Sequence, residues 1–97
     1  MNHVRFVCLD ITNPTAYARY RAGMEPLLAE YGGRFLLDAE LSAAHIHPAD
    51  FEPSRVLLIS FPDADTAERF FADPTYVETR QRWFTPAVPR SLAISIP

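Results

Sequence analysis

Two histidines, two positions apart, are the first residues in this sequence whose types and spacing could support chemistry. In an extended segment, His45 and His47 would point the same way and could together hold a metal ion. A third ligand would come from one of three acidic residues, Glu40, Asp50 or Glu52. An imidazole also exchanges a proton near neutral pH, which suits general acid or base catalysis. We predict His45 and His47 as catalytic residues without a metal; solvated loop histidines are the alternative.

Tyrosines form the second group of candidates. Tyr17, Tyr20 and Tyr31 are spaced along one stripe of an expected helix, and Tyr76 lies in the first turns of a later helix. A buried phenol needs a hydrogen-bond partner, and converging hydroxyls would suit a carbonyl-bearing or aromatic substrate. We predict Tyr20 and Tyr76 as catalytic residues. The alternative is core packing, with the hydroxyls at the rim.

Three further residues are predicted to bind a ligand. Arg34 follows a helix end and could hold a carboxylate or enolate in a fork, although it could equally form an ion pair or cap helix carbonyls. Arg80 is four residues beyond Tyr76, so it would share its helix face and complete an anion site. Trp83 could wall a pocket or lie in a subunit interface.

The elements that must position these side chains follow the order β-α-β-β-α-(α)-β. Short apolar runs predict strands at 4–11, 34–41, 55–61 and 91–96. A capping residue beside a proline predicts helix starts at Asn13-Pro14, Pro62-Asp63 and Asp73-Pro74. This order is the split βαβ arrangement of ferredoxin-like α+β domains, here with an extra short C-terminal helix. We expect residues 1–97 to form a single domain of this kind.

The junction between the first helix and the second strand is the clearest local signal. Gly32 stands where a helix needs a left-handed residue at its end, and a strand pattern begins directly afterwards. Within that strand, alternation predicts an apolar face and a polar face. The apolar face would comprise Phe35, Leu37, Ala39 and Leu41, and the polar face Arg34, Asp38 and Glu40.

The central strands, 4–11 and 55–61, are apolar on both alternating faces. Helices would cover one face of the sheet, and an apolar second face must also be covered. Because no further element is predicted to cover it, we expect a second copy of the chain there. The sequence therefore predicts a homodimer.

Four motifs in order resemble one known family. They are Asn13-Pro14 with Tyr17 and Tyr20, Tyr31-Gly32-Gly33-Arg34-Phe35-Leu36, the strand from Arg55 to Pro62, and Asp73-Pro74-Thr75-Tyr76. Together they are similar to the thirteen-thirty domain-of-unknown-function family. The resemblance implies a dimeric α+β barrel, in which two ferredoxin-like sheets pack face to face. Relatives in that superfamily include cofactor-free monooxygenases, polyketide cyclases and small-molecule degradation enzymes. The longer segment Ala44-His45-Ile46-His47-Pro48 departs from the family pattern.

Composition and charge exclude several other classes of protein. The net charge is −3 with 9 Lys and Arg, and no basic cluster suits a nucleic acid. No apolar run approaches the roughly 20 residues that span a bilayer, so no membrane role is expected. The single cysteine, Cys8, lies in an apolar strand and cannot form an internal disulfide, which favours a cytoplasmic location.

The sequence thus predicts a cofactor-independent enzyme acting on a small carbonyl or aromatic compound, of cyclase, isomerase or monooxygenase type. His, Tyr and Arg side chains would transfer protons and stabilise an anion. Two alternatives stay open, a non-catalytic dimer that binds a small molecule and a structural interaction module. No cofactor is implied, because the sequence has no phosphate loop, dinucleotide fingerprint or Cys-x-x-Cys pair.

Overall fold

The computed structural model describes residues 2–41 and 53–96. The strands are β1 (His3–Asp10), β2 (Arg34–Glu40), β3 (Arg55–Phe61) and β4 (Arg90–Ile96). The helices are α1 (Pro14–Glu30), α2 (Ala64–Ala72), α3 (Pro74–Thr79), the π-helical turn η1 (Arg80–Phe84) and α4 (Thr85–Ala87). The predicted order of strands and helices is therefore confirmed.

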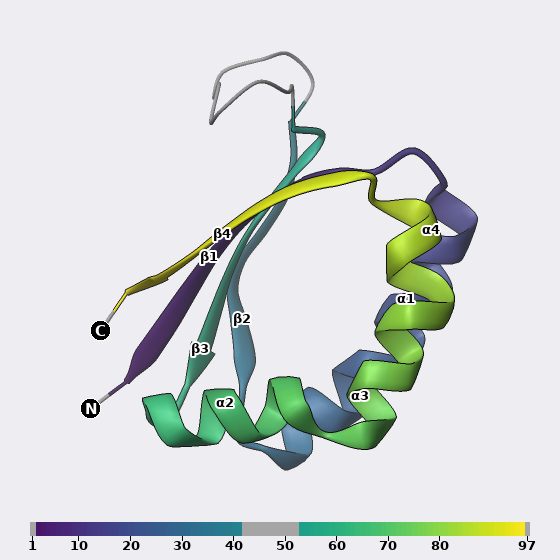
Figure 1. Ribbon diagram of the computed structural model, residues 1–97. Helices are drawn as coiled ribbons and strands as arrows, with labels where there is room; N and C mark the ends of the chain where they lie inside the picture. The colour runs from purple at the N-terminus through teal and green to yellow at the C-terminus, as the bar shows by residue number, and fades with distance from the viewer. Residues whose placement is uncertain (1, 42–52, 97) are drawn as a thin grey trace.

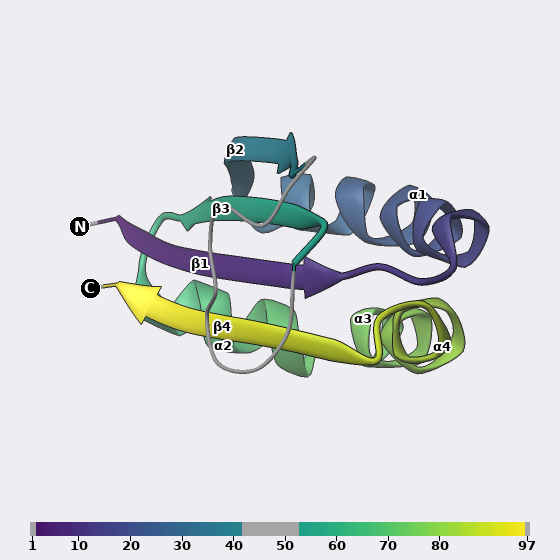
Figure 2. The ribbon, with the colours of Figure 1, turned by 90° about the horizontal axis from the view of Figure 1, so that it is seen from above.

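The four strands form one antiparallel sheet in the order β2-β3-β1-β4. This is the ferredoxin-like arrangement, in which the first strand is central and pairs with β3 and β4. All of the helices lie on one side of the sheet, with α1 and the α3–α4 segment side by side (Figures 1 and 2). The α+β fold predicted from the sequence is the observed one.

Side-chain caps begin the three main helices at the predicted places. The carboxamide of Asn13 accepts a hydrogen bond from the Ala16 amide, and Pro14 occupies the first helical position. Asp63 accepts from the Thr66 amide at the start of α2, and Asp73 accepts from the Thr75 amide at the start of α3. Each cap satisfies an amide that the helix cannot pair internally, so the sequence fixes where each helix starts.

The turn from α1 into β2 depends on two glycines. Gly32 has φ +74°, the left-handed conformation that side chains disfavour. At Gly33 a Cβ atom would clash with the buried side chain of Leu28, which favours glycine at this close approach of strand and helix. Helix and strand consequently pack back to back at this corner, as the junction predicts.

The predicted faces of β2 were wrong over part of the strand. The pairing of β2 with β3 shifts register between Phe35 and Leu37, which is a β-bulge at Leu36. The extra residue reverses the alternation, so Phe35 faces the helices while Leu37 faces away from them. Asp38 lies opposite Leu57, on the helix side, whereas Arg34 lies opposite Ser60 on the other face. Arg34 and Asp38 therefore do not share a face.

The second face of the sheet is apolar. Cross-strand partners on it are Phe6 with Leu58 and Ile94, and Cys8 with Val56 and Leu92. Among the described residues, no helix covers this face (Figure 1). Three large apolar side chains of the edge strands are nearly half exposed there, Leu37, Ile94 and Ile96. The sheet thus presents the uncovered apolar surface that the strand patterns predict.

The segment before the last strand is longer than the expected short helix. α3 continues through η1 into α4, where the Thr85 amide bonds to the Arg80 carbonyl five residues back. Pro86 has no amide hydrogen to donate, and a proline ring crowds the preceding helical turn. The wider π turn lets the chain continue up to Pro86, and π turns of this kind are frequent at functional sites.

Replacing Gly32 with alanine should destabilise the protein by about 1–2 kcal/mol, because alanine must adopt a left-handed backbone. Gly32→Asn should lose less, since asparagine tolerates that conformation. Urea unfolding of the three proteins measures the difference. Equal stability of the wild type and Gly32→Ala would contradict the assigned turn.

Candidate functional site

A cavity of about 350 Å³ lies between the helices and the sheet. This volume is at the lower end of the range that small-molecule sites have. Its aromatic lining consists of Tyr20, Phe35, Phe71, Tyr76 and Phe84. Its aliphatic lining includes Val7, Leu9, Met24, Leu57 and Ile59. Polar groups enter from Arg5, Arg21, Arg80, Gln81 and Ser91.

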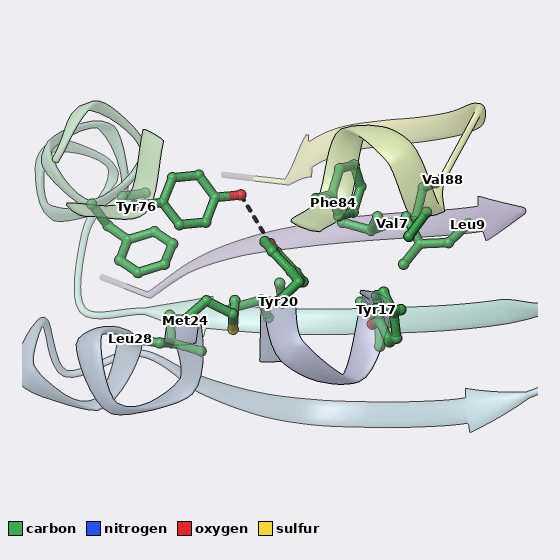
Figure 3. Close-up of a cluster of buried hydrophobic side chains, with 14 of the residues drawn as sticks. Val7, Leu9, Tyr17, Tyr20, Met24, Leu28, Tyr76, Phe84 and Val88 are labelled. Atoms are coloured by element: carbon green, nitrogen blue, oxygen red, sulfur yellow. Dashed lines mark hydrogen bonds between the residues drawn. The ribbon is translucent and has the colours of Figure 1, made fainter. Parts of the chain in front are cut away.

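Two buried tyrosines meet at this cavity. The hydroxyl oxygens of Tyr20, from α1, and Tyr76, from α3, are 3.0 Å apart and share a hydrogen bond (Figure 3). One phenol donates to the other, so the second phenol keeps its own O–H hydrogen for a further acceptor. The structure thus brings together the two tyrosines that the sequence singles out.

Burial raises the pKa of Tyr20 well above its usual range, and the neighbouring Tyr76 raises it further. The positive charge of Arg80 acts in the opposite direction. The Tyr20 phenol consequently stays protonated at neutral pH. It can donate a hydrogen bond to a carbonyl or an oxyanion, but it is a poor base.

Arg80 lies where the spacing from Tyr76 predicts. Both residues line the cavity, and the Arg80 guanidinium sits 4.9 Å from the centre of the Phe84 ring. The π turn η1 carries both Arg80 and Phe84, so it supplies one cation and one wall of the cavity.

Two arginines of the cavity were missed at the sequence level. Arg5 is on β1 between apolar neighbours, and its guanidinium lies 4.3 Å from the centre of the Phe71 ring. The available signal was a charged residue in phase with Val7 and Leu9 on the helix-facing side of a core strand. Arg21 follows Tyr20 directly and lies 4.1 Å from the centre of the Phe35 ring, a contact that depends on the unforeseen bulge.

Arg21 also borders a wider groove of about 1060 Å³ that is lined by residues of α1 and by helix-facing residues of β2 and β3. It is bonded to Asp38 at 2.9 Å and to Glu25 at 2.7 Å, and Asp38 also pairs with Arg55. Partial burial opposes ionisation of Asp38, but hydrogen bonds from the two arginines outweigh it and lower the Asp38 pKa. This network has a charge partner for each arginine, which indicates a structural role.

The other predicted site residues lie elsewhere. Arg34 is exposed on β2 and does not line the cavity. Trp83 packs against the core cluster, with the guanidinium groups of Arg19 and Arg82 each 5.1 Å from its ring centre, and it does not line the cavity either. His45 and His47 are outside the described residues. The roles assigned to these four residues stay predictions.

The family of the chain follows from comparison with known proteins. The model of the domain of unknown function DUF1330 matches residues 6–92. The chain belongs to the DUF1330 family. The resemblance noted in its sequence motifs is thereby confirmed, although the family name assigns no reaction. No curated protein matches the chain.

Solved structures with the same fold are numerous and distant in sequence. A protein of unknown function from Rhodopseudomonas palustris, RPA0582, is 20% identical with a TM-score of 0.82, and the match covers 98% of this chain and 80% of that one. A dimeric ferredoxin-like protein of unknown function from Jannaschia sp. CCS1 is 14% identical, with a TM-score of 0.65 and coverage of 100% and 99%. A putative antibiotic biosynthesis monooxygenase from Nitrosomonas europaea is 14% identical, with a TM-score of 0.66 and coverage of 98% and 88%. At these identities the likeness shows the fold alone.

Residues 2–41 and 53–96 hold neither a metal-binding cluster nor a membrane-spanning helix. Over those ranges, no three His, Cys, Asp or Glu side chains are grouped so that they could hold a metal ion. None of the described helices has the length and apolar character needed to cross a bilayer. The candidate site of the described residues is the cavity with its tyrosine pair.

The shared hydrogen bond of Tyr20 and Tyr76 is open to a double-mutant cycle. Tyr20→Phe and Tyr76→Phe should each cost about 1–3 kcal/mol, because each leaves a buried hydroxyl without its partner. The double variant should lose clearly less than the sum, since both hydroxyls are then gone. Urea unfolding gives the three free energies, and strictly additive losses would argue against the bond.

Proposed function

We propose that this protein is a cofactor-independent enzyme that binds a small carbonyl-bearing or aromatic compound between its sheet and its helices. The observation that carries the proposal is the Tyr20–Tyr76 hydroxyl pair on the wall of an otherwise largely apolar cavity. A protonated phenol aimed at a carbonyl oxygen favours its enolate, because a preformed donor stabilises developing negative charge. The likeness to a putative monooxygenase supports an enzyme on this fold, by analogy only.

The simplest reaction that fits is enolisation of the carbonyl compound. A C–H bond next to the carbonyl breaks, its electron pair becomes the enolate, and a phenol hydrogen bond stabilises the enolate oxygen. The proton passes to a base, for which the sequence offers His45 and His47. A proton then returns to carbon or to oxygen, so no oxidant or cofactor enters the step.

A second candidate is a non-catalytic protein that binds the same compound. The cavity lining favours it, because no His, Asp or Glu of the described residues lines the cavity and could act as the base. Binding requires the donors and the apolar walls alone. The two candidates differ in whether the bound compound exchanges a proton.

Proton exchange distinguishes the two candidates. We expect the wild-type protein to accelerate exchange of the benzylic hydrogens of phenylpyruvate for deuterium in D2O, followed by proton NMR. The Tyr20→Phe/Tyr76→Phe variant should lose about 100-fold or more of this acceleration, as removal of oxyanion donors does in other enzymes. Binding without exchange would favour the second candidate. Neither binding nor exchange across a set of aromatic keto acids and ketones would contradict both.

Matched variants separate these roles from general damage. Tyr31→Phe is the control, because the Tyr31 hydroxyl donates to Asp73 at 2.7 Å and does not line the cavity. We expect its exchange rate to equal that of the wild type. His45→Gln and His47→Gln test the proposed base, and the one that removes it should slow exchange while leaving binding intact. Unchanged exchange in both variants would exclude these histidines.

We further propose that two chains associate through the second face of the sheet. Support comes from its apolar cross-strand pairs and from the description of the Jannaschia neighbour as dimeric. An uncovered apolar sheet face of this kind is typical of an association surface.

Sedimentation velocity tests the dimer. Ile94→Asp places a charge among the apolar side chains of the second face and should convert the dimer to a monomer. Ser95→Asp, on the same strand but facing the helices, is the control and should remain dimeric. A monomeric wild type, or a dimer that tolerates Ile94→Asp, would contradict this interface.

A further inference from the structure

We infer that the ligand of the cavity is an anion, specifically an apolar or aromatic molecule that carries one carboxylate. The inference rests on the proposed function, because it names the class of compound that the same cavity would take. Its basis is the charge of the lining. Three arginines line the cavity, and no Asp or Glu of the described residues does. The chain as a whole has a net charge of −3, whereas the charged groups that line the cavity are all positive.

One of the three arginines is already neutralised. Arg21 forms ion pairs with Glu25 and Asp38 and donates a hydrogen bond to the Tyr17 hydroxyl at 3.2 Å. Partial burial disfavours its charge, but the bonds to Asp38 and Tyr17 outweigh that effect and raise the Arg21 pKa. Arg21 therefore forms part of the cavity wall, but its positive charge is already balanced and does not attract a ligand.

The other two arginines have no such counter-charge. Neither Arg5 nor Arg80 forms an ion pair with a described carboxylate, and each guanidinium instead sits over an aromatic ring, Phe71 for Arg5 and Phe84 for Arg80. A guanidinium placed over a ring keeps its planar fork of N–H donors free at its edge. That fork matches a carboxylate in both shape and charge.

The two cations also come from different parts of the fold. Arg5 is on the central strand β1, and Arg80 is on the π turn η1, beyond the helix that carries Tyr76. Arg5 is half-buried and Arg80 is exposed to solvent, and each guanidinium contacts an aromatic ring that also lines the cavity. The cavity therefore offers a carboxylate two donors that no described protein group uses.

The remaining surface defines the rest of the ligand. Aliphatic side chains from β1, β3 and α1 form much of the wall, which suits an apolar body. The free phenol hydrogen of the Tyr20–Tyr76 pair suits a second oxygen, such as a ketone next to the carboxylate. An aryl or alkyl keto acid carries these three parts in one small molecule.

The test compares two compounds that differ by one group. Phenylpyruvate and phenylacetone share a ring, a methylene and a ketone, but phenylacetone has a methyl group in place of the carboxylate. Isothermal titration calorimetry should show phenylpyruvate binding about tenfold more tightly or better, as expected for charge-assisted bonds. Its affinity should also fall as salt is added, whereas that of phenylacetone should stay constant.

Arginine variants assign the preference to the proposed groups. Arg5→Gln and Arg80→Gln should each weaken phenylpyruvate binding about tenfold while leaving phenylacetone unchanged. Arg82→Gln is the matched control, because Arg82 lies on the same turn as Arg80 but sits over Trp83, away from the cavity. It should bind both compounds as the wild type does.

The outcomes separate this inference from the function on which it rests. Equal binding of the two compounds, with loss in the Tyr20→Phe/Tyr76→Phe variant, would overturn the anion preference and leave the carbonyl site standing. A preference for phenylpyruvate that survives both arginine variants would overturn the assignment of Arg5 and Arg80. Failure of both compounds to bind the wild type would count against the cavity as a site for this class of ligand.

Discussion

A phenol hydroxyl removed from water must have a partner, and this requirement joins two helical segments of the protein. Tyr20 on α1 and Tyr76 on α3 are 56 positions apart in the sequence, and each provides the hydrogen-bond partner that the other needs. The bond fixes α1 against the segment from α3 to η1, and those two segments form the wall of the cavity opposite the sheet. The Tyr20–Tyr76 hydrogen bond thus positions the helical wall of the cavity, and it leaves one phenol hydrogen as a donor to a ligand.

The two faces of the sheet differ in polarity, because alternate side chains of the same strands point to opposite faces. β1 and β3 contribute alternate side chains to both, so each substitution in these strands acts on one side only. On the helix side, arginines and tyrosines interrupt the apolar lining and provide directed donors. On the other side, the cross-strand pairs at the centre of the sheet are apolar and uniform. The first pattern suits a small ligand with an apolar body and a few polar groups, and the second suits a broad and less directional contact.

Much of the fold could be predicted from the sequence, because its signals are local. The caps at Asn13, Asp63 and Asp73 and the left-handed turn at Gly32 depend on residues within one turn of each position. The bulge at Leu36 could not be predicted, since it is defined by the pairing of β2 with a strand far along the chain. The predicted faces of β2 were wrong beyond Phe35 because the prediction did not include this bulge.

Some residues of the site could be predicted from the sequence, and others could not. Tyr20, Tyr76 and Arg80 belong to helices, where spacing alone places side chains on one face. Arg5 and Arg21 reach the cavity through the sheet and the bulge, so their position depends on contacts between distant segments. Arg5 left one signal, its phase with Val7 and Leu9 on β1, whereas the bulge that brings Phe35 to Arg21 leaves none in a single sequence.

The central place of β1 also governs how the molecule is made. This strand is the first of the four along the chain, yet both of its neighbours, β3 and β4, follow α1 and β2. Its edge toward β4 therefore stays unpaired until Arg90–Ile96 has been translated, and the sheet closes through contacts of long sequence separation, which form slowly. During that interval the nascent chain exposes surface that other chains could bind. The same strand order that forms the cavity thus makes β4 the strand on which completion of the sheet depends.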